Sequence, residues 1–341
     1  MAEMYSSHAL VDVTRAQQLE SFHTGGLVIA NAAGELVGAI GDRRRLVFPR
    51  SAIKIIQALP VIESGAADHF AMSEVELAVI CASHSGSSYH VELVDGLLER
   101  IGLNEAALAC GCQLPIGAAA SQALLRGGGA ATRLHNNCSG KHAGMLATAQ
   151  HLGAAVAEYH DAFHGVQQRI RSVIESVVEH PLDGVLPGID GCGVPNWPLP
   201  LENLAVAFAR VVRGQGFTAD RTAAFERLVK ACWAHPCAMA GEGRFDTDVM
   251  TRFPGDVFVK IGAEGVYCGG IRSLGIGFAL KIDDGATRAA EVAAGAVIAR
   301  LLGGAAQALG EPVILHNTAG VAVGDVRPGA MLTSLLERVA V

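Results

Sequence analysis

Positive charge, aromatic rings and internal repeats are all scarce in this 341-residue sequence, and each scarcity excludes a class of protein. Aromatic residues make up 5%, and 33 acids outnumber 26 bases, which gives a formal net charge of −7. A nucleic-acid-binding surface needs clustered positive charge and rings for stacking, so no nucleic acid is expected as a partner. Without repeats or low-complexity tracts, a solenoid or a disordered chain is also unattractive.

Long hydrophobic runs free of charge are missing as well. The most apolar window, residues 289–306, carries Glu291 and Arg300, and both would be costly at the centre of a bilayer. We therefore interpret this window as a core helix and expect no membrane partner. The first fifteen residues have acids where a secretory signal needs a basic stretch and then an apolar one, so we expect a cytoplasmic protein.

Disulfides are not expected either, although the chain has eight cysteines. A cytoplasmic compartment keeps thiols reduced, which leaves two interpretations, buried apolar side chains or metal ligands. Half of the residues are hydrophobic and only 17% are charged, so the chain can bury a large core.

Strand-like segments lie toward both ends of the sequence, and helix-like segments fill its middle. Short β-type runs occur at 27–32, 35–40 and 45–49 and return at 256–262, 265–270 and 274–282. Helical periodicity runs through most of the stretch between them. This order predicts an α/β (α+β) fold in one domain with two lobes: an antiparallel sheet from about 1–50 and 240–341, and a helical lobe of about 51–239.

One of only five lysines closes the motif Ser51-Ala-Ile-Lys54. Pro49 is a plausible end to an extended segment, and an apolar rhythm follows at once, so Ser51 is expected at a helix start. A residue three positions later lies over the same helix face, which would bring the Lys54 amine near the Ser51 hydroxyl. Such a pair can act as nucleophile and base if the lysine is neutral, which costs about 4–5 kcal/mol at pH 7. The alternative is a capping serine followed by a surface lysine.

Two later motifs favour the catalytic interpretation. Ser83 and Ser85 lie in a small polar segment after an apolar helix, and Lys260 lies on a strand followed by Gly262. The order S-x-x-K, S-x-S-G, K-x-G is the chain order of penicillin-recognising serine hydrolases. Ser85 and Ile261 depart from that pattern, in which an asparagine and a hydroxyl residue occur. We expect related acylation chemistry but no β-lactam specificity.

A second cluster combines thiols with a lysine. Cys138 and Lys141 share one helix turn in "LHNNCSGKHAGM", and Cys192 lies in "DGCGVP", within a segment, 180–200, that is rich in proline and glycine. Two thiols from separate ordered segments suit zinc. The alternative is a pair of buried cysteines with a salt-bridging or phosphate-binding lysine. Neutral lysine is a rare ligand, but a zinc site worth about 10–16 kcal/mol could offset the loss of its proton.

Together these motifs resemble one family, the rhizobial-type L-asparaginases, also called asparaginase II. The likeness runs through "FHTGGLVIA", "PRSAIKIIQALP", "CASHSG", "HNNCSGKHAGML", "DGCGVP", "GEGRFDT" and "KIGAEGVY". It implies a serine β-lactamase- or glutaminase-like fold, a homodimer, and hydrolysis of L-asparagine to L-aspartate and ammonia.

The resemblance also implies roles for individual residues. It places two Ser–Lys pairs in the active site, Ser51 with Lys54 and Ser83 with Lys260. We favour Ser51 as the nucleophile, because its own amide at a helix start could donate to an oxyanion. The resemblance implies a zinc ion beside the substrate, bound by Cys138, Lys141 and Cys192.

Polar residues next to these motifs are candidates to bind the α-groups of the substrate: Arg50, Asn137 and His142 for the carboxylate, and Asp190 for the ammonium. Two other functions remain open. A zinc amidohydrolase would attack with metal-bound hydroxide and use the serines only as structure. A non-catalytic amino-acid sensor would keep the pocket without needing a neutral lysine.

Overall fold

The computed structural model describes residues 9–339, which form two compact units. The first unit contains the chain up to residue 52, residues 199–213, and the chain from residue 259; the second contains 53–198 and 214–258. Three stretches therefore lie in the other unit from the one expected: 51–52 and 199–213 belong to the first unit, and 240–258 belongs to the second. Residues 1–8 and 340–341 of the expected sheet lobe lie outside the described residues.

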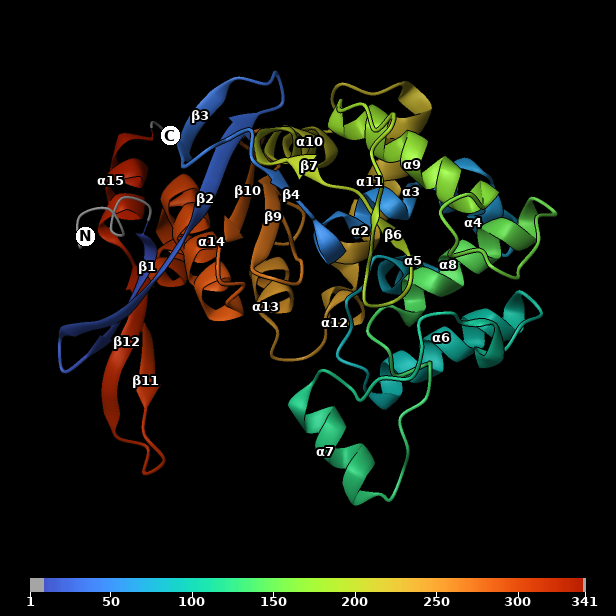
Figure 1. Cartoon of the computed structure of the whole chain (residues 1–341), viewed down its shortest axis with the longest axis horizontal. Helices are drawn as coiled ribbons and strands as arrows, with labels where there is room; N and C mark the ends of the chain where they lie inside the picture. Colours follow the sequence, from blue (N-terminus) through green and yellow to red (C-terminus); the bar gives the residue numbers. More distant parts are fainter. Residues whose placement is uncertain (1–8, 340–341) are drawn as a thin grey trace. The chain divides into compact units, whose positions relative to one another are not determined.

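The first unit is built on an eight-stranded antiparallel sheet drawn from both ends of the chain, as predicted (Figure 1). Its order is β11-β12-β1-β2-β10-β9-β8, and β3 pairs with β2 outside this path. The strand β2 has fourteen residues, so its first part pairs with β1 and its second part with β10 and β3. The strands are β1 (Ala9–Arg15), β2 (Gln18–Asn31), β3 (Leu36–Ile40), β8 (Val257–Ile261), β9 (Val266–Ile271), β10 (Ile276–Ile282), β11 (Val313–His316) and β12 (Ala322–Pro328).

The other elements of this unit are three helices that pack on the sheet, a 3-10 helix and a separate two-stranded sheet. Of the run predicted as a strand at 45–49, only two residues form β4, which pairs with β7. The apolar window at 289–306 begins inside α14, most of which is buried, so the predicted core helix is confirmed. These elements are β4 (Leu46–Val47), β7 (Leu199–Pro200), α10 (Leu201–Arg213), α14 (Thr287–Leu302), the 3-10 helix η3 (Gly304–Gly310) and α15 (Ala330–Arg338).

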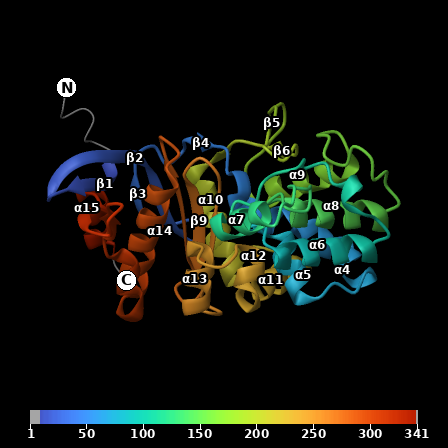
Figure 2. The ribbon, with the colours of Figure 1, turned by 90° about the horizontal axis from the view of Figure 1, so that it is seen from below.

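Helices α10 and α15 pack on opposite faces of the sheet. A Cβ added to Gly277 of β10 would lie 2.2 Å from the Ala205 carbonyl oxygen in α10, so only glycine permits this approach. A Cβ added to Gly38 of β3 would lie 3.1 Å from Leu335 in α15. The strand register puts Gly38 on the same side as Phe278, and consecutive residues of a strand face opposite sides. Helix α14 lies beside α15 (Figure 2). Arg300 of α14 donates a hydrogen bond of 2.6 Å to the Leu336 carbonyl of α15.

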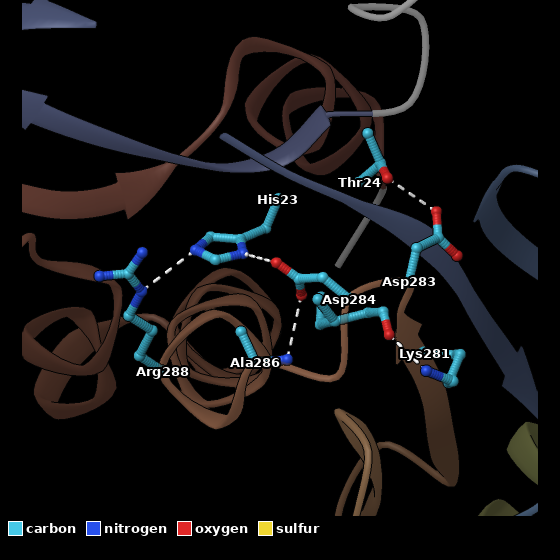
Figure 3. Close-up of polar contacts among 8 residues, drawn as sticks. His23, Thr24, Lys281, Asp283, Asp284, Ala286 and Arg288 are labelled. Atoms are coloured by element: carbon cyan, nitrogen blue, oxygen red, sulfur yellow. Dashed lines mark hydrogen bonds and ion pairs between the residues drawn. The ribbon is translucent and has the colours of Figure 1, made fainter. Parts of the chain in front are cut away.

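A polar cluster ties β2 to the turn between β10 and α14 (Figure 3). Arg288 donates to Nε2 of His23 at 3.1 Å, so Nδ1 carries the proton and donates to Asp284 at 2.6 Å. In the same region Lys281 donates to the Glu264 carbonyl at 2.6 Å. That contact anchors the turn that follows β8, the strand with the predicted K-x-G motif.

The second unit is helical, and its long helix α8 is largely buried: all eleven residues from Ser139 to Ala149 are buried. A capping box stabilises the start of α5: the Ser73 amide donates to the Glu76 carboxylate at 2.8 Å. The proline-rich segment 180–200 contains the short β5–β6 hairpin, which the sequence did not predict. Within residues 9–339 no helix has both the length and the apolar character needed to cross a bilayer.

The elements of this unit, together with the turn η1 that precedes it, are η1 (Arg50–Ile53), α2 (Lys54–Gln57), α3 (Leu59–Glu63), α4 (Ala66–His69), α5 (Glu74–Ile80), α6 (Ser88–Arg100), η2 (Glu105–Ala107), α7 (Ala118–Arg126), α8 (Ser139–His151), α9 (Gly165–Val178), β5 (Gly188–Ile189), β6 (Pro195–Asn196), α11 (Ala219–Ala234), α12 (Pro236–Met239) and α13 (Phe245–Arg252).

Candidate active site

The close approach of α5 and α8 brings two of the predicted motifs together (Figure 1). A Cβ on Gly140 would lie 2.1 Å from the Val79 carbonyl oxygen, and one on Gly144 would lie 2.7 Å from a side chain of α5. Any larger residue would push the helices apart, so the two glycines permit the contact. Ser83 follows the end of α5 and Cys138 precedes α8, so this packing sets the serine motif beside the cysteine motif.

The segment that carries Ser83 is fixed on several sides. The Ser83 amide donates to the Met239 carbonyl at 3.1 Å, and the next amide, of His84, donates to the Asn137 carbonyl at 3.2 Å. The buried His84 ring shares a 2.9 Å hydrogen bond with Ser139. Ser83 is only 4% exposed, so its hydroxyl is held in a constrained environment rather than on a free loop.

Lys54 connects the serine and cysteine motifs. Its side chain is completely buried, and its amine donates three hydrogen bonds: to the Ala82 carbonyl (2.5 Å), to Ser83 Oγ (3.0 Å) and to Cys138 Sγ (3.1 Å). Three acceptors match the three N–H donors of the ammonium form, which must lose one proton before the side chain can act as a base. A buried amine needs such partners, because an unpaired one would be strongly destabilising.

Cys192 contacts both of the other predicted zinc ligands. Its Sγ accepts a 3.1 Å hydrogen bond from Lys141 and another from the Cys138 thiol. The bond from Cys138 lowers the pKa of Cys192; the same bond, together with burial, raises the pKa of Cys138. Burial lowers the pKa of Lys141, but the charges of Cys192, Cys138 and Asp190 together outweigh it, and the net shift is upward. The three side chains are therefore coupled electrostatically.

The donor atoms of Cys138, Lys141 and Cys192 are of the types that zinc binds, and they lie close together. Two sulfur atoms and one nitrogen lie in contact, and zinc binds soft sulfur and nitrogen ligands. The hairpin with Cys192 is closed by Asp190, whose amide donates to the Val194 carbonyl at 2.9 Å. Among residues 9–339 no group of three His, Cys, Asp or Glu side chains could hold a metal, so a site here would depend on Lys141.

His142 follows Lys141 and is also completely buried. Burial, followed by the charge of Lys141, lowers the pKa of His142 to about 3, so its imidazole is neutral. Its Nδ1 lies 2.6 Å from the Tyr159 hydroxyl, which accepts a 2.9 Å hydrogen bond from the Ala109 amide. The sequence patterns did not identify Tyr159, which lies in an irregular stretch before α9 where no periodicity or motif marks it. Asn137 and Asp190, the other predicted substrate-binding residues of this unit, are only half-buried.

Ser51 and Arg50 lie in the first unit, on the 3-10 turn η1 rather than on the expected α-helix. The α-helix itself begins at Lys54. Arg50 has a φ of 51°, in the left-handed region that residues other than glycine rarely adopt. Such conformations persist only where the surrounding structure enforces them, and they cluster at functional sites.

Lys260 lies on β8 and is completely buried, with its amine 2.9 Å from the Ile261 carbonyl oxygen. A Cβ on the nearby Gly262 would lie 2.5 Å from the Pro49 carbonyl oxygen. The end of β8 therefore lies against the backbone just before Ser51. This close approach explains the glycine of the K-x-G motif.

The structure thus distributes the predicted residues over both units. Ser51, Arg50 and Lys260 belong to the first unit, and the other eight belong to the second. The expected pairs Ser51–Lys54 and Ser83–Lys260 each combine residues of different units, so they stay predictions. Within the second unit, the Lys54 amine is paired with the Ser83 hydroxyl, a contact that the spacing in the sequence did not predict.

Comparison with known proteins identifies the family. Among solved structures, one described as a beta-lactamase from Mycobacterium bovis matches with 13% identity over 78% of this chain and 89% of that chain. Its TM-score of 0.36 is too low for any conclusion about this chain to be based on it. No curated protein matches the sequence significantly. The L-asparaginase II family matches residues 11–328, nearly the whole sequence. The chain therefore belongs to the L-asparaginase II family, and it is an amidohydrolase of the L-asparaginase type.

Proposed function

We propose that this chain hydrolyses L-asparagine to L-aspartate and ammonia through a serine nucleophile activated by lysine. The observation that supports the mechanism is the completely buried Lys54 amine, which lies three residues after Ser51, the proposed nucleophile, and is 3.0 Å from the hydroxyl of Ser83, the proposed second proton carrier. A buried lysine beside a hydroxyl has the arrangement needed to move a proton to and from serine. Membership in the L-asparaginase II family supports the reaction class.

In the proposed reaction, Ser51 Oγ attacks the side-chain carbonyl carbon of asparagine. Lys54, in its neutral form, takes the serine proton and passes it to the departing nitrogen, which leaves as ammonia. An aspartyl ester on Ser51 remains. Water then hydrolyses this ester and releases aspartate, with the proton returned to Ser51. Ser83 and Lys260 are proposed as further proton carriers, and the Ser51 amide as an oxyanion donor.

The substrate is a zwitterion, so its two α-groups need opposite charges or dipoles around them. Asn137, His142 and Arg50 are proposed to bind the carboxylate, and Asp190 the ammonium. Cys138, Lys141 and Cys192 would hold zinc, which supplies positive charge and rigidity when bound. A homodimer in the cytoplasm is inferred from the family resemblance and the sequence.

We expect the enzyme to hydrolyse asparagine at least about 100-fold more efficiently than glutamine, and β-lactams not at all. One extra methylene shifts the reacting carbonyl away from the oxyanion donors, and a misplacement of about 1 Å can cost about 100-fold. The measurement is kcat/KM for ammonia release from each amide, with β-lactam opening followed by absorbance. Comparable values for glutamine would reject asparagine as the preferred substrate.

We expect Cys138→Ala and Cys192→Ala each to lower the zinc content of the purified protein and to raise KM for asparagine more than they lower kcat. Both thiols are proposed ligands, but the nucleophile is a serine, so metal loss should weaken binding more than chemistry. Elemental analysis and steady-state kinetics measure the two effects. Cys268→Ala is the control, since this buried thiol on β9 lies outside the cluster. Unchanged zinc in both cysteine variants would reject the ligand set, and loss of kcat at constant KM would reject the binding role.

A further inference from the structure

Tyr159 forms a short hydrogen-bonded chain with two other groups of the second unit. The Ala109 amide donates to the Tyr159 oxygen at 2.9 Å, and this oxygen lies 2.6 Å from Nδ1 of His142. Tyr159 is 1% exposed and His142 is 0% exposed, so neither side chain exchanges partners with bulk water. The hydrogens of this chain can be assigned from the donor inventory of each group.

The amide of Ala109 can only donate, so the Tyr159 oxygen is its acceptor. The phenolic hydrogen then needs an acceptor of its own, and Nδ1 of His142 is the other group within hydrogen-bond distance among residues 9–339. If Nδ1 carried a hydrogen instead, the Tyr159 hydrogen would be left buried without an acceptor, which is unfavourable. The arrangement in which every group is satisfied puts the imidazole proton of His142 on Nε2.

Nε2 of His142 is itself buried and has no hydrogen-bond partner among the described residues. A buried N–H without a protein partner is normally met by water or by a ligand. The charges that influence the pKa of this imidazole come from the cysteine and lysine cluster: Lys141, Cys138 and Lys54. His160 also acts on it, and Nδ1 of His160 is likewise buried without a partner in the described chain.

We propose that Tyr159 is a positioning residue that holds His142 in the Nε2–H tautomer, so that Nε2 donates a hydrogen bond to the α-carboxylate of the amino-acid substrate. This inference rests on the proposed function and adds to it a residue that touches no substrate atom. It also assigns His142 a defined donor atom. A neutral imidazole has one N–H, so the wrong tautomer would present a lone pair to a carboxylate and repel it.

The direct test is nuclear magnetic resonance of the holoenzyme labelled with ¹⁵N-histidine. The His142 signals are assigned by their loss in His142→Gln. We expect a protonated Nε2 and an unprotonated Nδ1 in the wild type, a shift of the Nε2 signal when L-aspartate is added, and partial or complete conversion to the Nδ1–H tautomer in Tyr159→Phe. An Nδ1–H tautomer in the wild type, or no response to aspartate, would overturn the proposal.

Kinetics supply a second readout. Tyr159→Phe should raise KM for asparagine about tenfold, while kcat changes less than about threefold, because the hydroxyl acts on binding through His142. His142→Gln, which keeps an N–H near the Nε2 position, should bind asparagine better than His142→Asn, which does not reach it. Tyr267→Phe is the control, since this buried tyrosine lies on β9. If the wild-type protein released no ammonia, the proposed function would be rejected but the tautomer of His142 would not. If Tyr159→Phe were active with unchanged KM and unchanged histidine signals, the role of Tyr159 would be rejected.

Discussion

Replacing Lys54 with arginine is expected to lower kcat/KM for asparagine by about 10³-fold or more, even though the positive charge is kept. Arginine stays protonated in proteins, so it cannot accept the proton of a serine. Its planar fork also cannot reproduce the three contacts that the Lys54 amine makes with the Ala82 carbonyl, Ser83 and Cys138. The measurement is steady-state ammonia release, with circular dichroism to show that the variant is folded.

Lys54 is completely buried, so the larger arginine could also unfold the second unit. Lys54→Met has nearly the same length without the amine, and it should be equally inactive while packing more easily. Lys230→Arg is the matched control, because Lys230 is exposed on α11 and pairs with Glu226 at 3.2 Å. If Lys54→Arg or a folded Lys54→Met kept most of its kcat, Lys54 would not be the proton carrier.

Ser51→Ala is expected to have the second large effect, a loss of kcat of about 10⁴-fold or more with little change in stability. Removing a nucleophile removes the covalent intermediate, and the residual rate then comes only from binding and oxyanion stabilisation. Ser51 is only partly buried and lies on a short 3-10 turn, so loss of one hydroxyl should leave the fold intact. Ser334→Ala, at an exposed position on α15, serves as the control.

Ser83→Ala belongs in the same series, because the Lys54 amine is hydrogen-bonded to Ser83. As a proton carrier, Ser83 should matter less than Ser51. The reverse order, with Ser83→Ala the weaker enzyme, would make Ser83 the nucleophile and Lys54 its base. Near-wild-type rates in both serine variants would favour a metal-bound hydroxide instead.

The main elements of the fold could be predicted from the sequence where the pattern is strong. The helices of the middle region and the strands β3, β8, β9 and β10 have clear periodicity or dense β-branched residues. The strands β1, β11 and β12 were missed, as was the first half of β2. Residues of β11 and of the first half of β2 are largely exposed, so they show no apolar alternation. The pairing of β1 with β12 joins opposite ends of the sequence, which local patterns do not report.

For the candidate site, motifs in the sequence could predict which residues to consider but not which of them lie in contact. Lys54, Cys138 and Cys192 were predicted as site residues because these residue types are chemically informative wherever they occur. The motifs did not predict the Lys54–Ser83 contact, which joins α2 to the segment after α5. Helical spacing reports neighbours one turn away, whereas this contact joins residues 29 positions apart.

The central claim is that asparagine hydrolysis passes through a covalent ester on Ser51. Mass spectrometry of enzyme mixed with asparagine and quenched with acid during turnover tests this claim most directly. We predict that the protein gains the mass of one aspartyl group, that this mass maps to the peptide containing Ser51, and that it is missing in Ser51→Ala. Capture of the adduct on any other residue, or rapid turnover with no adduct at any quench time, would contradict the account.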